Sequence, residues 1–263
     1  MLAQNNQKKI LIKKTKIMIK SDGTGTIPNI TNFDKLVSHA TGLGTSYNPA
    51  NPLLKVTALS SQLAVMQASQ KALDDAFSDL TTARNQRKVA FAPLGALATR
   101  IQNAVIASTT SEQTDESVKS LVRKIKGERA TPLKSKEKLA AEGQTPEETH
   151  SASQLGYNDQ VENFQKLVSL LKKTPEYKPN EADLKVEALD AYQAELALKN
   201  KAVIDSQILE NNTRNERDEL MDKPTTGLVD VASDVKNYIK SVFGAASVQY
   251  RSISGLKFTY RHS

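Results

Sequence analysis

The side chains with the clearest potential for chemistry are four arginines, which occur as two copies of one short motif. Arg84 and Arg87 flank an Asn-x pair, and so do Arg214 and Arg217. Arginines three residues apart on a helix face the same side, so each pair could bind a phosphate or carboxylate. Alternatively, bases near a helix C-terminus interact favourably with the helix dipole and with carbonyl groups of the next loop. We favour this structural interpretation and keep the four arginines as candidate interaction residues.

Other residue types that support catalysis or metal binding are scarce. The chain has no cysteine, which excludes thiolate zinc sites, iron–sulfur ligation and cysteine nucleophiles. Its three histidines, His39, His150 and His262, lie far apart, and none has a second metal-binding side chain at a convincing helical spacing. No phosphate-binding loop or nucleophile elbow is present. The sequence therefore predicts a protein that is not an enzyme, with no cofactor, metal or small-molecule substrate.

The net charge of +7 is concentrated near the N-terminus. Residues 1–20 carry no acid and six lysines, namely Lys8, Lys9, Lys13, Lys14, Lys16 and Lys20. Such an arm could bind phosphate groups, but if Met18 is the true start most of it is lost. Arg251 and Lys257 form a second basic group, close to the aromatic residues Tyr250, Phe258 and Tyr260. Bases beside aromatic rings suit weak, non-specific nucleic-acid binding, which is the alternative function.

No segment of the chain has the pattern of a signal peptide or a membrane span. The apolar residues of the N-terminal arm are interrupted by lysines, so they form no continuous apolar core of a signal sequence. No uninterrupted apolar run reaches the 18 residues typical of a spanning helix. We therefore expect no membrane span and a cytoplasmic location.

The chain contains an internal duplication. Residues 32–38 recur at 163–169 with six of seven positions identical. Residues 47–87 align with 177–217 without gaps, and 14 of the 41 positions are identical, where chance predicts roughly two or three. This level of identity predicts two related structural units.

Each unit is predicted to be built around one long helix. The segment 52–91 lacks internal glycine and proline and is rich in residues that favour helix. Asn51 and Pro52 would begin it, and the second copy would run from Asn180 to just before Pro224. Shorter helices are expected at 33–40, 95–107, 112–126, 158–173 and 228–243. The pattern predicts that Thr110 caps the third of these and Gly244 ends the last, whereas residues 248–260 read as a strand or an extended docked tail.

Apolar residues in the first long helix follow a heptad-like stripe, which is typical of packing against another helix. The stripe comprises Val56, Leu59, Leu63, Met66, Leu73, Phe77 and Leu80, with Gln70 in an otherwise apolar slot. In the second copy, Gln193, Asn200 and Gln207 occupy stripe positions. In one interpretation these polar residues lie in the packed stripe and determine the register of the helix or its choice of partner. In the other, the second long helix packs on a rotated stripe. We favour the rotated stripe, which consists of Tyr192, Leu196, Val203, Ile204 and Ile208.

Together these features predict an all-α protein of two tandem helical-bundle units. A basic N-terminal arm covers residues 1–31, unit one 32–129, a polar linker 130–157, and unit two with its tail 158–263. A duplicated helical body that is close to neutral and lacks catalytic motifs favours a scaffold or adaptor, which binds a protein partner or a second copy of itself.

Overall fold

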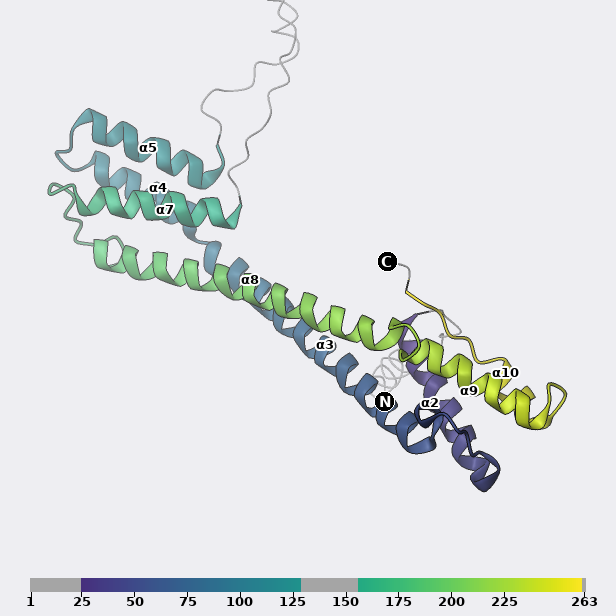
Figure 1. Ribbon diagram of the computed structural model, residues 1–263. Coiled ribbons are helices and arrows are strands. Elements are labelled where there is room, and N and C mark those ends of the chain that lie inside the picture. Colours follow the sequence, from purple (N-terminus) through teal and green to yellow (C-terminus); the bar gives the residue numbers. More distant parts are fainter. Residues whose placement is uncertain (1–24, 129–155, 262–263) are drawn as a thin grey trace, which may run out of the picture. The chain divides into compact units, whose positions relative to one another are not determined.

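The computed structural model describes residues 25–128 and 156–261, which are all-α and contain no β-strand (Figure 1). Two short 3-10 helices, η1 (Gly44–Ser46) and η2 (Pro52–Leu54), precede the first long helix. The α-helices are α2 (Thr26–Gly42), α3 (Val56–Phe91), α4 (Leu94–Ile106), α5 (Glu112–Lys126), α7 (Tyr157–Lys172), α8 (Val186–Asp222), α9 (Leu228–Phe243) and α10 (Val248–Ser254). The all-α prediction is confirmed.

Both long helices begin later than predicted. Asn51 does cap a helix, but that helix is η2, in which the Leu53 N–H donates to the Asn51 side chain at 3.0 Å. The helix α3 then begins at Val56, and α8 begins at the equivalent position, Val186. Gly244 follows α9 with a φ of 87°, as expected for a glycine that ends a helix.

The predicted cap of the helix at 112–126 was wrong. Ser111, not Thr110, caps α5 by accepting a hydrogen bond from the Thr114 N–H. The Thr110 hydroxyl is instead within 2.6 Å of a carboxylate oxygen of Asp115 and donates to the Val105 carbonyl at 3.0 Å. Thr110 lies one residue before the cap position, so its hydroxyl bonds to Val105 and Asp115 rather than to the first N–H groups of α5.

The C-terminal segment is only partly extended. Residues Val248–Ser254 form α10, because Ser247 caps them by accepting from the Tyr250 N–H at 3.1 Å. From residue 255 to 261 the chain has no helix or strand, and it docks on α2, as expected for the alternative of an extended docked tail. The Asn29 side chain donates to the Thr259 carbonyl at 2.8 Å and accepts from the Thr259 N–H at 3.1 Å.

The described residues form two compact units. Unit 1 contains residues up to Phe77 together with those from Leu209 onward, and unit 2 is Ser78–Ile208. The units divide the chain differently from the predicted repeats, since each predicted repeat contributes residues to both units. The helices α3 and α8 likewise each supply residues to both.

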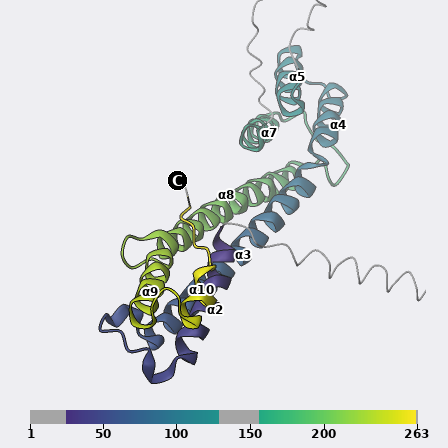
Figure 2. The same cartoon turned by 90° about the vertical axis from the view of Figure 1, so that its right-hand side faces the viewer.

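Unit 1 has one apolar core, formed by α2, α9 and α10 with the first part of α3 (Figure 2). Phe33 and Leu36 of α2, Leu59 and Met66 of α3, and Val235 of α9 are completely buried in it. The C-terminal tail covers this core with Phe258, which is partly buried against it.

Unit 2 has a separate core, in which α5 packs against both α4 and α7 (Figure 1). Ile101, Val118, Phe164 and Leu189 are completely buried there, one from each of α4, α5, α7 and α8. The last part of α3 and the first part of α8 run antiparallel within this unit, because Arg84 contacts Gln207 while Ala90 contacts Tyr192.

The buried stripes of the two long helices occupy equivalent positions. The favoured rotated stripe in the second copy was therefore right for Leu196 and Val203, which are buried, and for Tyr192, which packs on the core, but wrong for Ile204 and Ile208. In α3 the buried residues recur every seven positions at Leu59, Met66, Leu73 and Leu80. In α8 they recur at Leu189, Leu196, Val203, Glu210 and Arg217. Asn200 is 7% exposed, whereas Ile204 and Ile208 are 45% and 54% exposed. The polar residues stay buried because each has a hydrogen-bonding partner, which lowers the cost of burial. Phe77, expected in the first stripe, is 57% exposed.

Several side-chain contacts recur in both units at equivalent positions. The Tyr47 hydroxyl donates to the Leu54 carbonyl at 2.8 Å in unit 1, and Tyr177 does the same to Leu184 at 2.8 Å in unit 2. Burial raises the pKa of both tyrosines to about 12. Each tyrosine therefore holds the turn that precedes a long helix as a neutral hydrogen-bond donor.

Candidate functional site

The four motif arginines lie on the long helices, Arg84 and Arg87 on α3 and the other two on α8, and they donate hydrogen bonds to side chains. In unit 2, Arg84 donates to Gln207, and Arg87 donates to Asn200 at 2.9 Å. In unit 1, Arg214 pairs with the buried Glu210. These partners are side chains of the two long helices, not the loop carbonyls that the structural interpretation of the motif expected.

Arg87 belongs to a polar network inside unit 2. Its guanidinium carbon lies 3.9 Å from the centre of the Tyr157 ring, close enough for a cation–π interaction. Asn200 accepts from Arg87 and donates in turn to Asn158. The arginine thereby connects α3 to both α7 and α8.

Arg217 occupies the equivalent position in unit 1 and is only 5% exposed. It donates to the neighbouring carboxylate of Asp218 and, at 3.4 Å, to the Gln70 side chain. Gln70 is the counterpart of Asn200, so both arginines bind an amide at matching positions. Asp218 also accepts two hydrogen bonds from Arg261, both at 2.8 Å.

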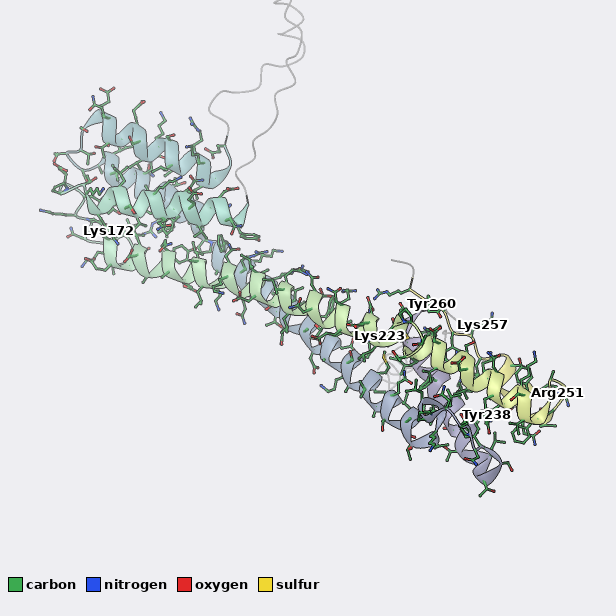
Figure 3. All side chains as sticks on the ribbon, in the orientation of Figure 1. Lys172, Lys223, Tyr238, Arg251, Lys257 and Tyr260 are labelled. Carbon is green, nitrogen blue, oxygen red and sulfur yellow. The ribbon has the colours of Figure 1, made fainter. Side chains whose placement is uncertain are left out.

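The other candidate residues lie at the ends of the chain. Lys8, Lys9, Lys13 and Lys14 are outside the described residues. Figure 3 shows Arg251 on α10 and Lys257 on the tail, where the Lys257 carbonyl accepts from Asn32 at 2.9 Å.

The aromatic residues beside these bases contact other parts of unit 1. Phe258 packs on the core, the Tyr260 hydroxyl donates to Asp230, and the Tyr250 ring lies 5.7 Å from the Lys240 amine. The hydrogen bond from Tyr260 lowers the pKa of the Asp230 carboxyl. These contacts hold the tail on unit 1, and nucleic-acid binding stays a prediction.

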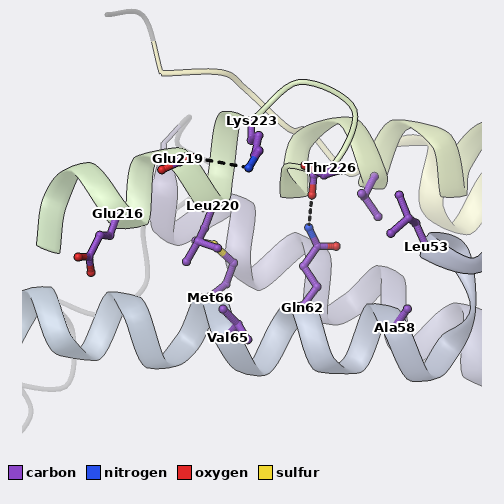
Figure 4. A pocket seen from close by; sticks show the side chains of 11 residues that line it. Leu53, Ala58, Gln62, Val65, Met66, Glu216, Glu219, Leu220, Lys223 and Thr226 are labelled. Atoms are coloured by element: carbon purple, nitrogen blue, oxygen red, sulfur yellow. Dashed lines mark hydrogen bonds and ion pairs between the residues drawn. The ribbon is translucent and has the colours of Figure 1, made fainter.

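One of the hollows in unit 1 is a groove of about 570 Å³ that the sequence did not reveal (Figure 4). Its apolar lining includes three exposed side chains, Leu53, Val65 and Leu220, which are 43%, 50% and 37% exposed. Met66 and Val231, both buried, lie beneath them. Large apolar side chains that remain exposed together are typical of an interaction surface.

Polar groups line the groove beside these apolar side chains. Gln62 donates to the Thr226 carbonyl at 2.9 Å, and Lys223 lies 3.6 Å from Glu219 (Figure 4). Glu216 also lines the groove, and no ion pair to it is found within the described residues. The groove therefore combines apolar side chains with a carboxylate that is free to meet a cation.

The equivalent surface of unit 2 is filled by its own side chains. Tyr192, the counterpart of Gln62, donates to the Ala90 carbonyl at 2.7 Å and packs on Phe164 with ring centres 5.6 Å apart. Burial and the nearby Glu195 raise the pKa of Tyr192 to about 12. The unit 2 residues equivalent to Val65 and Leu220 are Glu195 and Ala90. The groove thus exists where the two copies differ.

Sequence reasoning missed the groove because it depends on how distant segments meet. One usable signal was present: Val65 and Leu220 each stand beside a methionine of the buried stripe, so two consecutive positions are apolar. In the second repeat, the charged residue Glu195 occupies the position that corresponds to Val65. An apolar residue at an expected solvent position in only one copy indicates a specialised surface.

No metal-binding cluster is found among the described residues. One stretch within Val56–Ile106 contains an 18-residue window with a mean hydropathy of 1.3, of which 28% is buried. This is weak support for a membrane span, because helices of soluble proteins pass the same test, and α3 ends at Phe91 before α4 begins. The absence of a span stays a prediction.

Comparison of the chain with family models, curated proteins and solved structures finds no match.

Proposed function

We propose that the chain is a non-catalytic helical scaffold that binds an amphipathic helix of a protein partner in the groove of unit 1. The observation that carries the proposal is the groove itself, where Leu53, Val65 and Leu220 stay exposed. Covering an exposed apolar side chain of this size contributes up to about 2 kcal/mol. Three such side chains in one groove can therefore support specific binding.

The lining of the groove favours a particular kind of partner. A helix laid into a groove presents apolar residues at intervals of three and four. Glu216 and Glu219 outnumber Lys223 among the charged lining residues, and Lys223 is already near Glu219. We therefore expect a partner helix that carries lysine or arginine beside its apolar face.

The internal duplication supports a scaffold of this design. Two repeats, covering 32–129 and 158–263, would supply matching surfaces, as the paired contacts of Tyr47 and Tyr177 suggest. In this proposal Tyr192 closes one surface to stabilise the fold, while Gln62 leaves its counterpart open for the partner. A cytoplasmic location fits this role.

The contrast between the copies supplies the test. The substitution Gln62→Tyr introduces the side chain that fills the equivalent surface of unit 2, where it reaches a carbonyl of the facing helix. The matched control is Gln67→Tyr, the same change at an exposed position of α3 that does not line the groove. Both variants are expected to keep the helical content of the wild type.

The readout is quantitative mass spectrometry of proteins that co-purify with each form from its own cells. We expect at least one protein to fall more than tenfold with Gln62→Tyr and to remain unchanged with Gln67→Tyr. Equal recovery of every co-purifying protein with both variants would contradict the proposal.

A further inference from the structure

One residue of the loop beside the groove has a strained backbone. Thr225, between α8 and α9, has a φ of 66°, and it is the one residue other than glycine with a positive φ in the described parts of the chain. Left-handed backbone is unfavourable for a β-branched residue, because its Cβ crowds the following carbonyl group. Contacts with the surrounding structure must therefore hold this loop in place.

The strained loop forms one edge of the groove. The carbonyl of Thr226, the next residue, accepts a hydrogen bond from Gln62 of α3 at 2.9 Å (Figure 4). Lys223 and Thr226 both line the groove. The loop is tight, because the Gly227 N–H donates to the Lys223 carbonyl at 2.7 Å. A change in the backbone of Thr225 would therefore move the Thr226 carbonyl, and with it this edge of the groove.

Asp230, in the first turn of α9, joins this loop to the C-terminal tail. One of its carboxylate oxygens accepts from the Thr225 N–H at 2.7 Å, and the other accepts from the Tyr260 hydroxyl. Hydrogen bonds to an ionised group are stronger than those between neutral groups. The residue after Asp230, Val231, lines the groove. The tail is thus connected to the strained residue through one carboxylate.

The tail also contacts the end of α8, which forms another edge of the groove. The backbone N–H of Arg261 donates to Asp222 at 3.1 Å, and its guanidinium group donates to Asp218 at 2.8 Å. Leu220 lies between these two carboxylates in the sequence and lines the groove. The tail is itself anchored on α2 through both polar groups of the Thr259 backbone. It therefore holds two of the segments that frame the groove.

We propose that the C-terminal tail regulates the groove. Docking of residues 255–261 keeps Thr225 in its strained conformation and keeps the groove in the form that binds the partner helix. The docked tail and the bound helix then stabilise one another, because coupling between two sites is reciprocal. This regulation rests on the proposed function of the groove, but the coupling between tail and loop can be measured without the partner.

The test removes the one hydroxyl that connects the tail to Asp230. The substitution Tyr260→Phe keeps the contacts of Thr259 and Arg261, so we expect the tail to stay docked and the protein to stay folded. The matched control is Tyr250→Phe, which removes a hydroxyl from α10 of the same unit and leaves both contacts to Asp230 in place.

The readout is NMR spectroscopy of the loop and of the groove edge. With Tyr260→Phe we expect the Gly227 amide to exchange with solvent about tenfold faster, because the loop loses a hydrogen bond to a charged group that supports it. The side-chain amide signal of Gln62 should shift in the same variant, and both signals should stay unchanged with Tyr250→Phe. Either signal remaining unchanged in Tyr260→Phe, or equal changes in both variants, would overturn the proposal.

A second variant tests whether the strain at Thr225 causes this dependence on the tail. Glycine adopts a positive φ without strain. Adding Thr225→Gly to Tyr260→Phe should therefore slow the exchange of Gly227 by at least about fivefold. A smaller recovery would overturn the proposal, since the loop would then depend on the tail for another reason.

The partner is tested separately by the co-purification experiment described above. We expect a protein that is lost with Gln62→Tyr to fall about tenfold with Tyr260→Phe as well, and to remain with Tyr250→Phe. Equal recovery of that protein with the two tyrosine variants would overturn the regulation and leave the proposed function intact. Absence of any protein that depends on Gln62 would overturn the proposed function, and the exchange rates would still decide whether the tail holds the loop.

Discussion

Replacing Arg217 by methionine should destabilise the protein, because the arginine is the most deeply buried cation of the duplicated motif. Its side chain is 6% exposed, and it donates to Asp218 from two nitrogen atoms and to Gln70 from a third. Methionine keeps the helix propensity and much of the side-chain volume. The substitution therefore removes mainly the hydrogen bonds and the charge.

The expected loss follows from the partners that remain. A hydrogen bond to a charged group contributes about 1.5–3 kcal/mol, and breaking a buried ion pair costs about 3–5 kcal/mol. Asp218 is 31% exposed and keeps both hydrogen bonds from Arg261, which reduces the cost. We expect the free energy of unfolding to fall by about 2 kcal/mol.

The assay is urea unfolding at pH 7, followed by circular dichroism at the helical band. The matched control is Arg84→Met, since Arg84 is exposed and is expected to change the free energy by less than about 0.5 kcal/mol. Adding Gln70→Leu to Arg217→Met should recover part of the loss, because the half-buried amide that lost its arginine partner is then also removed. A single variant as stable as the wild type would refute the assignment of a structural role to Arg217.

Three further predictions test the turns that begin the helices. Tyr177→Phe should cost about 1 kcal/mol at pH 7 through the lost hydrogen bond to Leu184. With a pKa of about 12, the folded tyrosine keeps its proton while the unfolded one ionises above pH 10, so wild-type stability falls from pH 10 to 12. The difference from Tyr177→Phe should shrink over that range in urea titrations, and a constant difference would contradict the pKa. Gly227→Ala should lower the melting temperature and cost about 1–3 kcal/mol, because the added carbon would lie 2.6 Å from backbone atoms of Lys223; an unchanged melting temperature would contradict this geometry. Ser111→Ala should cost about 1 kcal/mol of unfolding free energy through the lost cap of α5, and a variant as stable as the wild type in urea would contradict the assignment of the cap.

Features that depend on neighbouring residues were predicted well from the sequence. The expected helix at 112–126 has the bounds of α5, and 228–243 has those of α9. Capping residues, prolines and glycines act within one turn of a helix, so they can be recognised without knowing the fold. The missed cap at Ser111 is one residue from the predicted position.

Features that depend on pairing between distant segments were not predicted. The stripe on α8 was partly misassigned because Asn200 and Arg217 look unsuitable for burial until their partners Arg87 and Gln70 are known. The composition of the two units could not be predicted either, because a duplication in sequence does not specify which copies pack together. The groove escaped prediction because it depends on what fills the surface between distant segments. Tyr192 fills that surface in unit 2, whereas its counterpart Gln62 leaves the surface of unit 1 open.

Photo-crosslinking from the groove in the protein's own cells tests the proposed function most directly. A photoreactive residue is placed at Val65, which lines the groove, and as a control at Val89, which is exposed on the same helix outside it. We predict a discrete adduct from position 65 alone, mapped to a basic amphipathic helix of another protein and lost with Gln62→Tyr. No adduct, the same adducts from both positions, or an adduct only to this chain itself would contradict the proposed function.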